Sequence, residues 1–278
     1  MTVGVERAAF FSRQERFDSV GSTNDVVAGW LADGTPEVCL ALADEQTDGR
    51  GRAGRTWHAP RGAALLLSFG FRPAWIAPDR AWRIPAAVSL AMADAAEEAA
   101  GLPDRAIRLK WPNDLVVEAA ESGGGVRKLG GVLSEGVDLA GSDPRLVVGI
   151  GLNADWAEVD FPEAIAASMT SLLAASNGRP LEPARLLDAF LLRVEPRIEA
   201  LRAGWFDVAD WTDRQVTTGR EIRIDLPDGT TISDHGLGVD ALSGGLVIGG
   251  GATGGGRTVT ERTLLVGEVT RVRLGVGV

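Results

Sequence analysis

The sequence predicts an α+β protein, with helices packed on a mixed or antiparallel β-sheet and a small β-barrel at the C-terminus. Short continuous apolar runs, typical of buried strands, alternate with longer segments whose apolar residues recur at helical spacing. After residue 214 the helical spacing disappears, and short strands are separated by Pro-Asp-Gly and glycine-rich turns. We therefore expect one domain over residues 1–213 and a barrel domain over residues 214–278.

Composition narrows the class of protein. A chain of 278 residues is long enough for two separate cores. A formal net charge of -10 disfavours a nucleic acid as the main partner. The single cysteine, Cys39, lies in an apolar run and is interpreted as a core residue in a reducing compartment. Because no stretch has the apolar length of a signal peptide or a membrane span, we expect a cytoplasmic protein without a membrane partner.

The first part of the chain combines a strand, a helix cap and a helix. Residues 8–20 are predicted to form a short strand that leads into Gly21-Ser22-Thr23-Asn24. Ser22 or Thr23 is a suitable N-cap for the amphipathic helix that follows. Two hydroxyls and an amide at a helix start can also bind a small polar ligand.

A glycine- and arginine-rich loop at residues 46–57 follows the strand predicted at residues 38–43. It begins at Gln46, interleaves Arg50, Arg52 and Arg55 with three glycines, and ends at Trp57. Gly49, Gly51 and Gly54 match G-x-G-x-x-G, but residues 63–69 indicate a strand where a dinucleotide fold requires a helix. The chain contains neither the downstream motifs of a protein kinase nor a Gly-Lys-Ser/Thr P-loop. The loop is therefore interpreted as binding a phosphate-bearing ligand, the alternatives being a solvated surface loop or a nonspecific nucleic-acid contact.

The middle of the chain carries polar motifs on predicted strands. After a helix at residues 83–100 comes a strand at residues 106–110, which Pro112 stops in the motif Lys110-Trp111-Pro112-Asn113-Asp114. Paired glycines follow in residues 127–135 and 146–153, and we expect them to leave room for a ligand lying across the sheet. The only two lysines, Lys110 and Lys128, and three of the four asparagines lie in these stretches or at the first helix cap.

The last third of the chain changes from helix to strands. The apolar spacing of residues 180–202 predicts a helix that Pro196 kinks or interrupts. The barrel strands are predicted at residues 221–226, 246–248, 264–266 and 269–274. Residues 249–256 are predicted to form a flexible hairpin tip.

Taken together, these stretches resemble the biotin protein ligases. The resemblance covers roughly residues 20–155 and rests on five motifs in the family's order: Gly21-Ser22-Thr23-Asn24, the loop from Gly49 to Trp57, Lys110-Trp111-Pro112-Asn113-Asp114, Lys128 to Glu135, and Gly149-Ile150-Gly151-Leu152-Asn153. It implies a catalytic domain of the class II synthetase-like, lipoyl/biotinyl ligase type and an SH3-like terminal barrel. The family's regulatory members begin with a DNA-binding domain, and only about twenty residues precede the first motif here, so repressor activity is not expected.

The resemblance also implies a reaction and its participants. Biotin's carboxylate attacks the α-phosphate of ATP to form biotinyl-5'-AMP, with Mg²⁺ and cationic side chains around the phosphates. A lysine of a biotin carboxyl carrier protein, the acceptor in acyl-CoA carboxylases, then attacks the adenylate. We expect the enzyme to be a monomer or a homodimer.

The resemblance assigns site residues to three groups. Lys128 should sit near the reacting carboxyl and the α-phosphate. The catalytic group is Lys128, Arg50, Arg52, Lys110 and Asp114; the biotin group is Ser22, Thr23, Asn24, Gln46, Gly49, Arg50, Arg52, Lys128, Gly131 and Gly151; the nucleotide group is Arg52, Arg55, Trp57, Asn113, Lys128 and Asn153. Trp57 is expected to stack on adenine, and Asn153 to bond it. No metal ligands are implied, and His58 and His235 receive no role.

Two alternatives stay open at this stage. A lipoate or octanoate ligase shares the fold and acylates lysine, although the Arg/Gly loop and Trp-Pro-Asn-Asp favour biotin. A catalytically idle protein that only binds biotin is the second alternative. The glycines of the loop are interpreted as hinges of a lid that keeps water from the adenylate.

Overall fold

The computed structural model describes residues 10–119, 125–249 and 261–273. Its larger part is a seven-stranded sheet in the order β1-β2-β3-β7-β6-β5-β4, in which only β1 and β2 run parallel. The strands are β1 (Arg13–Phe17), β2 (Cys39–Ala43), β3 (Ala64–Phe71), β4 (Ile107–Lys110), β5 (Asp114–Ala119), β6 (Gly125–Val137) and β7 (Arg145–Asn153). The predicted mixed, mainly antiparallel sheet is confirmed, and β3 directly after the Arg/Gly loop confirms that this is not a dinucleotide-binding turn.

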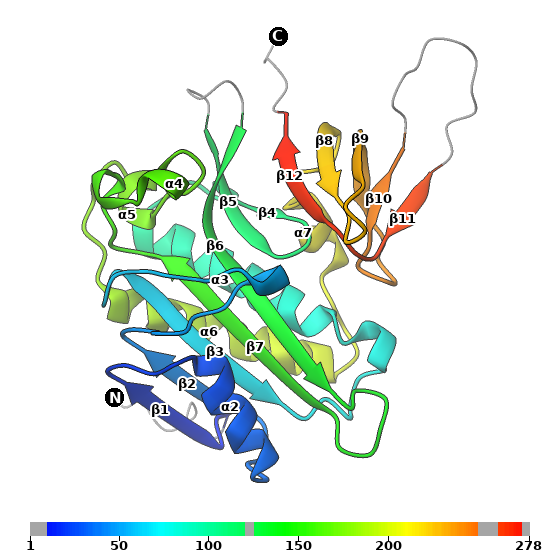
Figure 1. Ribbon diagram of the computed structural model, residues 1–278. Coiled ribbons are helices and arrows are strands. Elements are labelled where there is room, and N and C mark those ends of the chain that lie inside the picture. Colours follow the sequence, from blue (N-terminus) through cyan, green and yellow to red (C-terminus); the bar gives the residue numbers. More distant parts are fainter. Residues whose placement is uncertain (1–9, 120–124, 250–260, 274–278) are drawn as a thin grey trace.

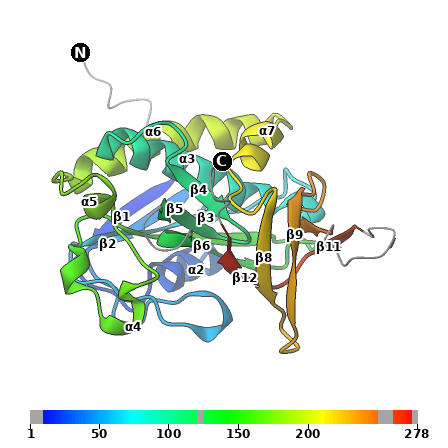
Figure 2. The same cartoon turned by 90° about the horizontal axis from the view of Figure 1, so that it is seen from above.

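Helices cover both faces of this sheet. The long helices α3 (Arg83–Ala100) and α6 (Pro183–Arg202) lie together on one face, whereas α2 (Thr23–Ala32) lies on the other (Figures 1 and 2). Shorter helices are α4 (Glu163–Ala166), α5 (Leu172–Ala175) and α7 (Val208–Asp213), with 3-10 turns η1 (Arg52–Gly54), η2 (Pro78–Arg80) and η3 (Glu158–Asp160). None of the helices in the described ranges has the length and apolarity needed to cross a membrane.

Pro196 was predicted to kink or interrupt the helix, and the interruption is wrong, because α6 continues through this residue. Val194 and Ile198, on either side of the proline, are fully buried in the main core together with α3 and the sheet. Packing of this apolar face therefore outweighs the hydrogen bond that the proline removes from the helix.

A second, five-stranded antiparallel sheet follows, in the order β11-β10-β9-β8-β12 (Figure 1). Its strands are β8 (Arg220–Asp225), β9 (Thr231–Val239), β10 (Leu246–Ile248), β11 (Arg262–Leu264) and β12 (Glu268–Val272). This sheet confirms the expected small β-structure at the C-terminus. Sequence reasoning missed β9, whose polar residues 233–235 interrupt the apolar alternation. The predicted flexible tip at 249–256 lies outside the described residues apart from Gly249.

The core of the second sheet extends into the first. Trp111 and Val116, from the motif at Pro112 and from β5, are buried in one cluster with Ile222, Ile224 and Val269. Because the two sheets share these apolar contacts, β12 is held beside the predicted site.

Candidate active site

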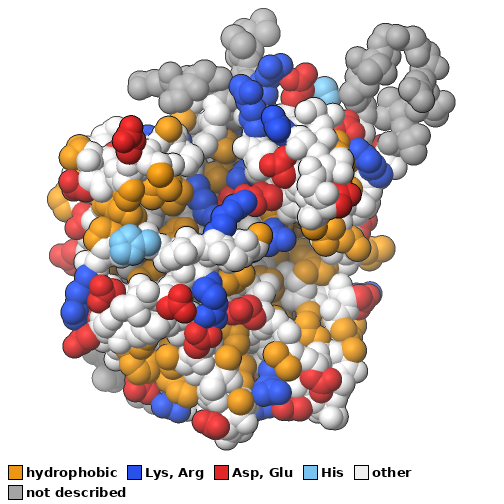
Figure 3. Space-filling model, in the orientation of Figure 1, with side chains coloured by type: hydrophobic (Ala, Val, Ile, Leu, Met, Phe, Trp, Pro, Cys, Tyr) orange, Lys and Arg blue, Asp and Glu red, His pale blue; other side chains and the backbone are white. Residues whose placement is uncertain are grey.

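A cavity of about 570 Å³ lies between the first sheet, the Arg/Gly loop, the segment before α5, and β12. Its lining includes every predicted site residue except Gly49 and Asn153: Ser22, Thr23, Asn24, Gln46, Arg50, Arg52, Arg55, Trp57, Lys110, Asn113, Asp114, Lys128, Gly131 and Gly151. In Figure 3, Lys and Arg side chains gather at a hollow near the middle of this face of the molecule. Residues from all five sequence motifs therefore meet in one place.

Both lysines of the chain meet at Asp114. Lys128 Nζ lies 2.6 Å from Asp114 Oδ1, and Lys110 Nζ lies 2.8 Å from Oδ2. The hairpin between β4 and β5 places Lys110 opposite Asp114, and β6 runs beside β5. Burial alone would raise the pKa of Asp114, but the two ammonium groups outweigh it and lower the pKa below its usual value. Asp114 is therefore an ionised carboxylate that fixes two cations.

One end of the cavity is lined by neutral polar side chains, which hydrogen-bond to one another and, through Asn24, to the carboxylate of Glu135. The backbone N–H and the hydroxyl of Thr23 donate to Gln46 Oε1, at 2.8 and 3.0 Å. Thr23 Oγ1 also lies 2.7 Å from the hydroxyl of Ser68, which donates to Asn24 Oδ1 at 2.6 Å. Asn24 in turn donates to Glu135. Ser22 occupies the N-cap position of α2 without a capping side-chain bond, so its hydroxyl is not used by the helix.

Sequence reasoning missed Ser68. It is fully buried in β3 and is the only polar residue in the apolar run of that strand. A lone hydroxyl inside a strand buried on both faces needs a partner, and this was the signal that could have found it.

The arginines of the loop are bound to carboxylates on two sides. Arg50 makes two hydrogen bonds to Asp25 of α2, at 2.7 and 2.6 Å, and this pairing raises the pKa of its guanidinium. Arg55 makes two bonds of 2.5 Å to Glu268 of β12. Arg52 donates to the carbonyl of Gly267 at 3.4 Å. The loop thus connects α2 with the second sheet, a link that no sequence spacing indicated.

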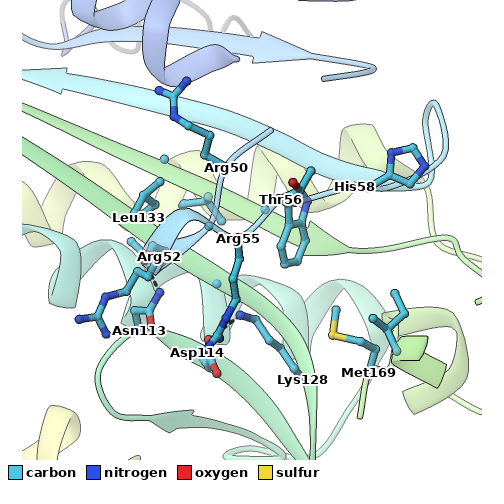
Figure 4. Close-up of a pocket in the computed structure, with 18 of the residues that line it drawn as sticks. Arg50, Arg52, Arg55, Thr56, His58, Asn113, Asp114, Lys128, Leu133 and Met169 are labelled. Carbon is cyan, nitrogen blue, oxygen red and sulfur yellow. Dashed lines mark hydrogen bonds and ion pairs between the residues drawn. The ribbon is translucent and has the colours of Figure 1, made fainter. Parts of the chain in front are cut away.

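Figure 4 shows how these side chains point. Arg55 and Lys128 extend toward Asp114, whereas Arg50 points away from them. Arg52 lies near Asn113 at the opposite edge from His58 and Met169. Cations therefore surround one part of the cavity.

The glycines predicted to leave room for a ligand divide into three kinds. A Cβ on Gly151 would lie 2.6 Å from the indole of Trp57, and one on Gly149 would lie 2.1 Å from Asn24 Oδ1, so both make room for side chains of the site itself. A Cβ on Gly130 would instead lie 2.6 Å from the carbonyl of Gly151, so Gly130 is needed for strand packing. Gly131 lines the cavity beside the Lys128 ammonium.

Two predicted residues lie behind the lining. Asn153 is fully buried and donates to the carbonyl of Thr170 at 3.0 Å; its side-chain oxygen has no partner within the described ranges. A Cβ on Gly49 would lie 2.5 Å from the carbonyl of Trp57, so this glycine lets the two ends of the loop cross closely.

The wall opposite the polar end was not predicted. It contains the apolar residues Trp156, Pro162, Ile165 and Met169, together with Ser168 and His58. Backbone bonds fix this segment to β6, because Lys128 N–H donates to Ser168 O and Thr170 N–H donates to Lys128 O, at 2.7 and 2.8 Å. His58, to which the sequence assigned no role, therefore belongs to the site lining.

Comparisons with known proteins agree with this fold. The biotin/lipoate A/B protein ligase family model matches residues 17–153. A biotin–[acetyl-CoA-carboxylase] ligase of Mycobacterium tuberculosis H37Rv is 33% identical over 214 residues, which cover 76% of this chain and 74% of that protein. The bifunctional ligase/repressor BirA of Bacillus subtilis 168 is 28% identical over 180 residues, 65% of this chain and 52% of that protein.

The chain belongs to the biotin/lipoate A/B protein ligase family, which confirms the resemblance drawn from its motifs. Among solved structures, a biotin protein ligase from Aquifex aeolicus in complex with biotin and ATP has a TM-score of 0.74 at 24% identity. The alignment covers 95% of this chain and all of the other, and at this identity it supports the fold.

Proposed function

We propose that this protein attaches biotin to one lysine of a biotin carboxyl carrier protein, in two steps at one site and through biotinyl-5'-AMP. The observation that carries the proposal is the composition of the cavity: a neutral hydrogen-bonding end lies in the same space as Lys110, Lys128 and three arginines. A neutral polar ring and a run of phosphates are the two unlike groups that such a cavity suits.

In the first step, a carboxylate oxygen of biotin attacks the α-phosphorus of ATP. A bond forms between this oxygen and the α-phosphorus, which gives the mixed anhydride. The bond between the α-phosphorus and the oxygen that bridges to the β-phosphate breaks, and pyrophosphate leaves with the electron pair. Lys128 and the loop arginines reduce the repulsion between the two anions and stabilise the charge that builds on the phosphate. Asp114 holds Lys128 in place through its 2.6 Å bond, and Lys110 balances the second oxygen of that carboxylate.

In the second step, the carrier's lysine attacks the acyl carbon. The amine enters as an ammonium ion, loses one proton to solvent before the attack and a second as the C–N bond forms. The bond between the acyl carbon and the phosphate oxygen breaks, and AMP leaves with its electron pair. This sequence needs no enzyme nucleophile, in agreement with Cys39, which is fully buried outside the cavity lining.

The remaining site assignments are proposals of the same kind. Ser22, Thr23, Asn24 and Gln46 hold the ureido ring, and Gly131 and Gly151 form the floor. Trp57 lines the cavity and is proposed to stack on adenine. A direct bond from Asn153 to adenine stays a prediction, because the structure places its amide behind Thr170. The domain boundary between residues 213 and 214 also stays a proposal.

Mg²⁺ fits the site as a companion of the nucleotide. No group of three or more His, Cys, Asp or Glu side chains within the described ranges is arranged to hold a metal. Mg²⁺ commonly keeps several waters and binds substrate phosphates with only one or two carboxylates. Asp114 and Glu268 are the carboxylates in the lining, and such an ion would neutralise phosphate charge.

The polar end also separates biotin from other acids. Lipoate and octanoate carry no ring amide to pair with Thr23, Ser22 or Gln46, and a buried polar site rejects an analogue that leaves its groups unpaired. The test is to incubate a carrier domain with protein, ATP, Mg²⁺ and each acid, and to weigh the intact carrier by mass spectrometry. Of the three acids, we expect only biotin to increase the mass of the carrier. A carrier in which the acceptor lysine is replaced by arginine should show no mass increase. A lipoyl or octanoyl adduct would contradict the assignment.

A further inference from the structure

A second cavity, of about 420 Å³, adjoins the proposed active site. Four residues line both cavities: Arg52, Asn113, Val132 and Leu133. The rest of the second cavity is formed by η2, the start of α3, the turn at Pro112, parts of β6 and α7, and the turns of the second sheet at residues 243–245 and 265. The two cavities therefore meet at these shared residues.

Three tryptophans form much of its wall. The indole N–H of Trp82 donates to Leu242 O at 3.0 Å and that of Trp111 to Gly244 O at 3.1 Å, so both rings are fixed against the turn at 240–245. Trp211 is 6% exposed, and its indole N–H has no hydrogen-bond partner within the described ranges. The tryptophans therefore give the cavity an apolar part, which lies beside polar lining residues that include Asp79, Ser89 and Asn113.

The charges of the two cavities differ. The charged lining of the active-site cavity consists of five cations, Arg50, Arg52, Arg55, Lys110 and Lys128, and two carboxylates, Asp114 and Glu268. In the second cavity the ionisable lining residues within the described ranges are Arg52 and Asp79. A polyanion such as pyrophosphate is better matched by the first cavity. Indole walls with an acidic residue suit a cation on an apolar stem.

The second step of the proposed reaction needs such a route. Biotinyl-5'-AMP occupies the first cavity when the amine arrives. The Arg/Gly loop is bound to α2 through Arg50 and to β12 through Arg55. The lysine must therefore reach the acyl carbon through space that the intermediate does not fill. Leu265, which lines the second cavity, is 66% exposed, and its neighbour Val266 is 57% exposed.

We propose that the second cavity is the entrance for the carrier's acceptor lysine. This role rests on the proposed function and identifies where its protein substrate docks. The lysine's aliphatic stem lies along the tryptophans, and its ammonium passes Asp79. Leu265 and Val266 contact the carrier around the lysine.

Two half-reactions test the entrance in Asp79→Lys and Leu265→Arg proteins. Biotin-dependent ATP–pyrophosphate exchange reports the first step, and transfer from added biotinyl-5'-AMP to a carrier domain reports the second. We expect exchange to stay within about twofold of wild type, while kcat/KM for the carrier falls about tenfold or more, since a misplaced charge at a docking rim slows association. Asp79→Glu and Leu265→Met should transfer normally. Asp33→Lys, which reverses an exposed acid that lines neither cavity, controls for net charge.

Each other outcome overturns the entrance. Normal transfer by both charge variants would show that the lysine enters elsewhere. An equal fall in exchange and transfer would instead assign the second cavity to the nucleotide or to pyrophosphate release. A wild-type protein without biotin-dependent exchange would contradict the proposed function itself, which distinguishes that failure from a failure of the entrance alone.

Discussion

Replacing Lys128 by alanine should separate chemistry from folding. The ammonium of Lys128 is 2.6 Å from Asp114, whose side chain is 8% exposed and keeps Lys110 as a second partner. Removing one partner of a buried ion pair costs up to about 3–5 kcal/mol of unfolding free energy, and less where a second cation remains, which is below the roughly 5–15 kcal/mol of a typical domain. Losing a cation where charge builds up costs about 3–4 kcal/mol in the transition state, or roughly 10²–10³ in rate.

We therefore expect Lys128→Ala to fold and to lose about 100-fold or more of its biotin-dependent ATP–pyrophosphate exchange. Exchange is measured alongside urea unfolding. Arg127→Ala is the matched control, because Arg127 is adjacent, similarly exposed (25% against 29%), pairs with Glu158 at 2.6 Å and does not line the cavity. Its exchange should stay within about threefold of wild type. Normal exchange by folded Lys128→Ala, or an equal loss in Arg127→Ala, would refute the reasoning.

Four further predictions concern other residues. Glu268→Ala removes the carboxylate that binds Arg55 at 2.5 Å. An exposed pair of this kind contributes up to about 1 kcal/mol, so KM for ATP should rise about fivefold. An unchanged KM in steady-state kinetics would exclude a role for this pair. Arg214→Met leaves the buried Glu97 carboxylate unpaired and should cost about 3–5 kcal/mol in urea unfolding, partly recovered by adding Glu97→Gln. Because the pKa of Asp114 is lowered by its lysines, its ionised form stabilises the fold above about pH 4, and this contribution is lost as pH falls through the lowered pKa. In Asp114→Asn the free energy of unfolding should therefore decrease less steeply with falling pH than in the wild type. The same dependence of unfolding free energy on pH in both proteins would contradict this prediction. Burial raises the pKa of Cys39 to about 11, so a thiol reagent at pH 8 should label unfolded but not native protein.

Much of the fold followed from local patterns. Helix α3 has the predicted limits because its apolar residues recur at helical spacing without a break, and β3 was recognisable as a continuous apolar run. The two errors have physical causes. The break at Pro196 did not occur because buried neighbours hold α6 on the sheet, and β9 was hidden by polar residues in a strand that is mostly half-exposed.

The site was predictable where residue type carried the chemistry, as with the two lysines and the loop arginines. Partners contributed by distant elements could not be predicted. Arg55 and Glu268, for example, are 213 residues apart in the sequence, and no local pattern indicates that they are in contact. Nor did the sequence indicate the apolar wall at Met169, whose residues resemble any core segment. The glycine pairs were recognised as unusual, but the structure shows that Gly149 and Gly151 make room for Asn24 and Trp57.

The proposed function depends most directly on adenylate formation from biotin. ATP–pyrophosphate exchange on the purified protein with Mg²⁺ should be run separately with biotin, lipoate, octanoate and no added acid. We expect exchange with biotin alone, because only its ureido ring can pair with the polar end around Thr23 and Gln46. Exchange with lipoate or octanoate would show that the protein activates one of these acids, and would assign it to the lipoate or octanoate ligases of its family. No exchange with any acid, together with measurable biotin binding, would contradict a ligase and favour a protein that only binds biotin.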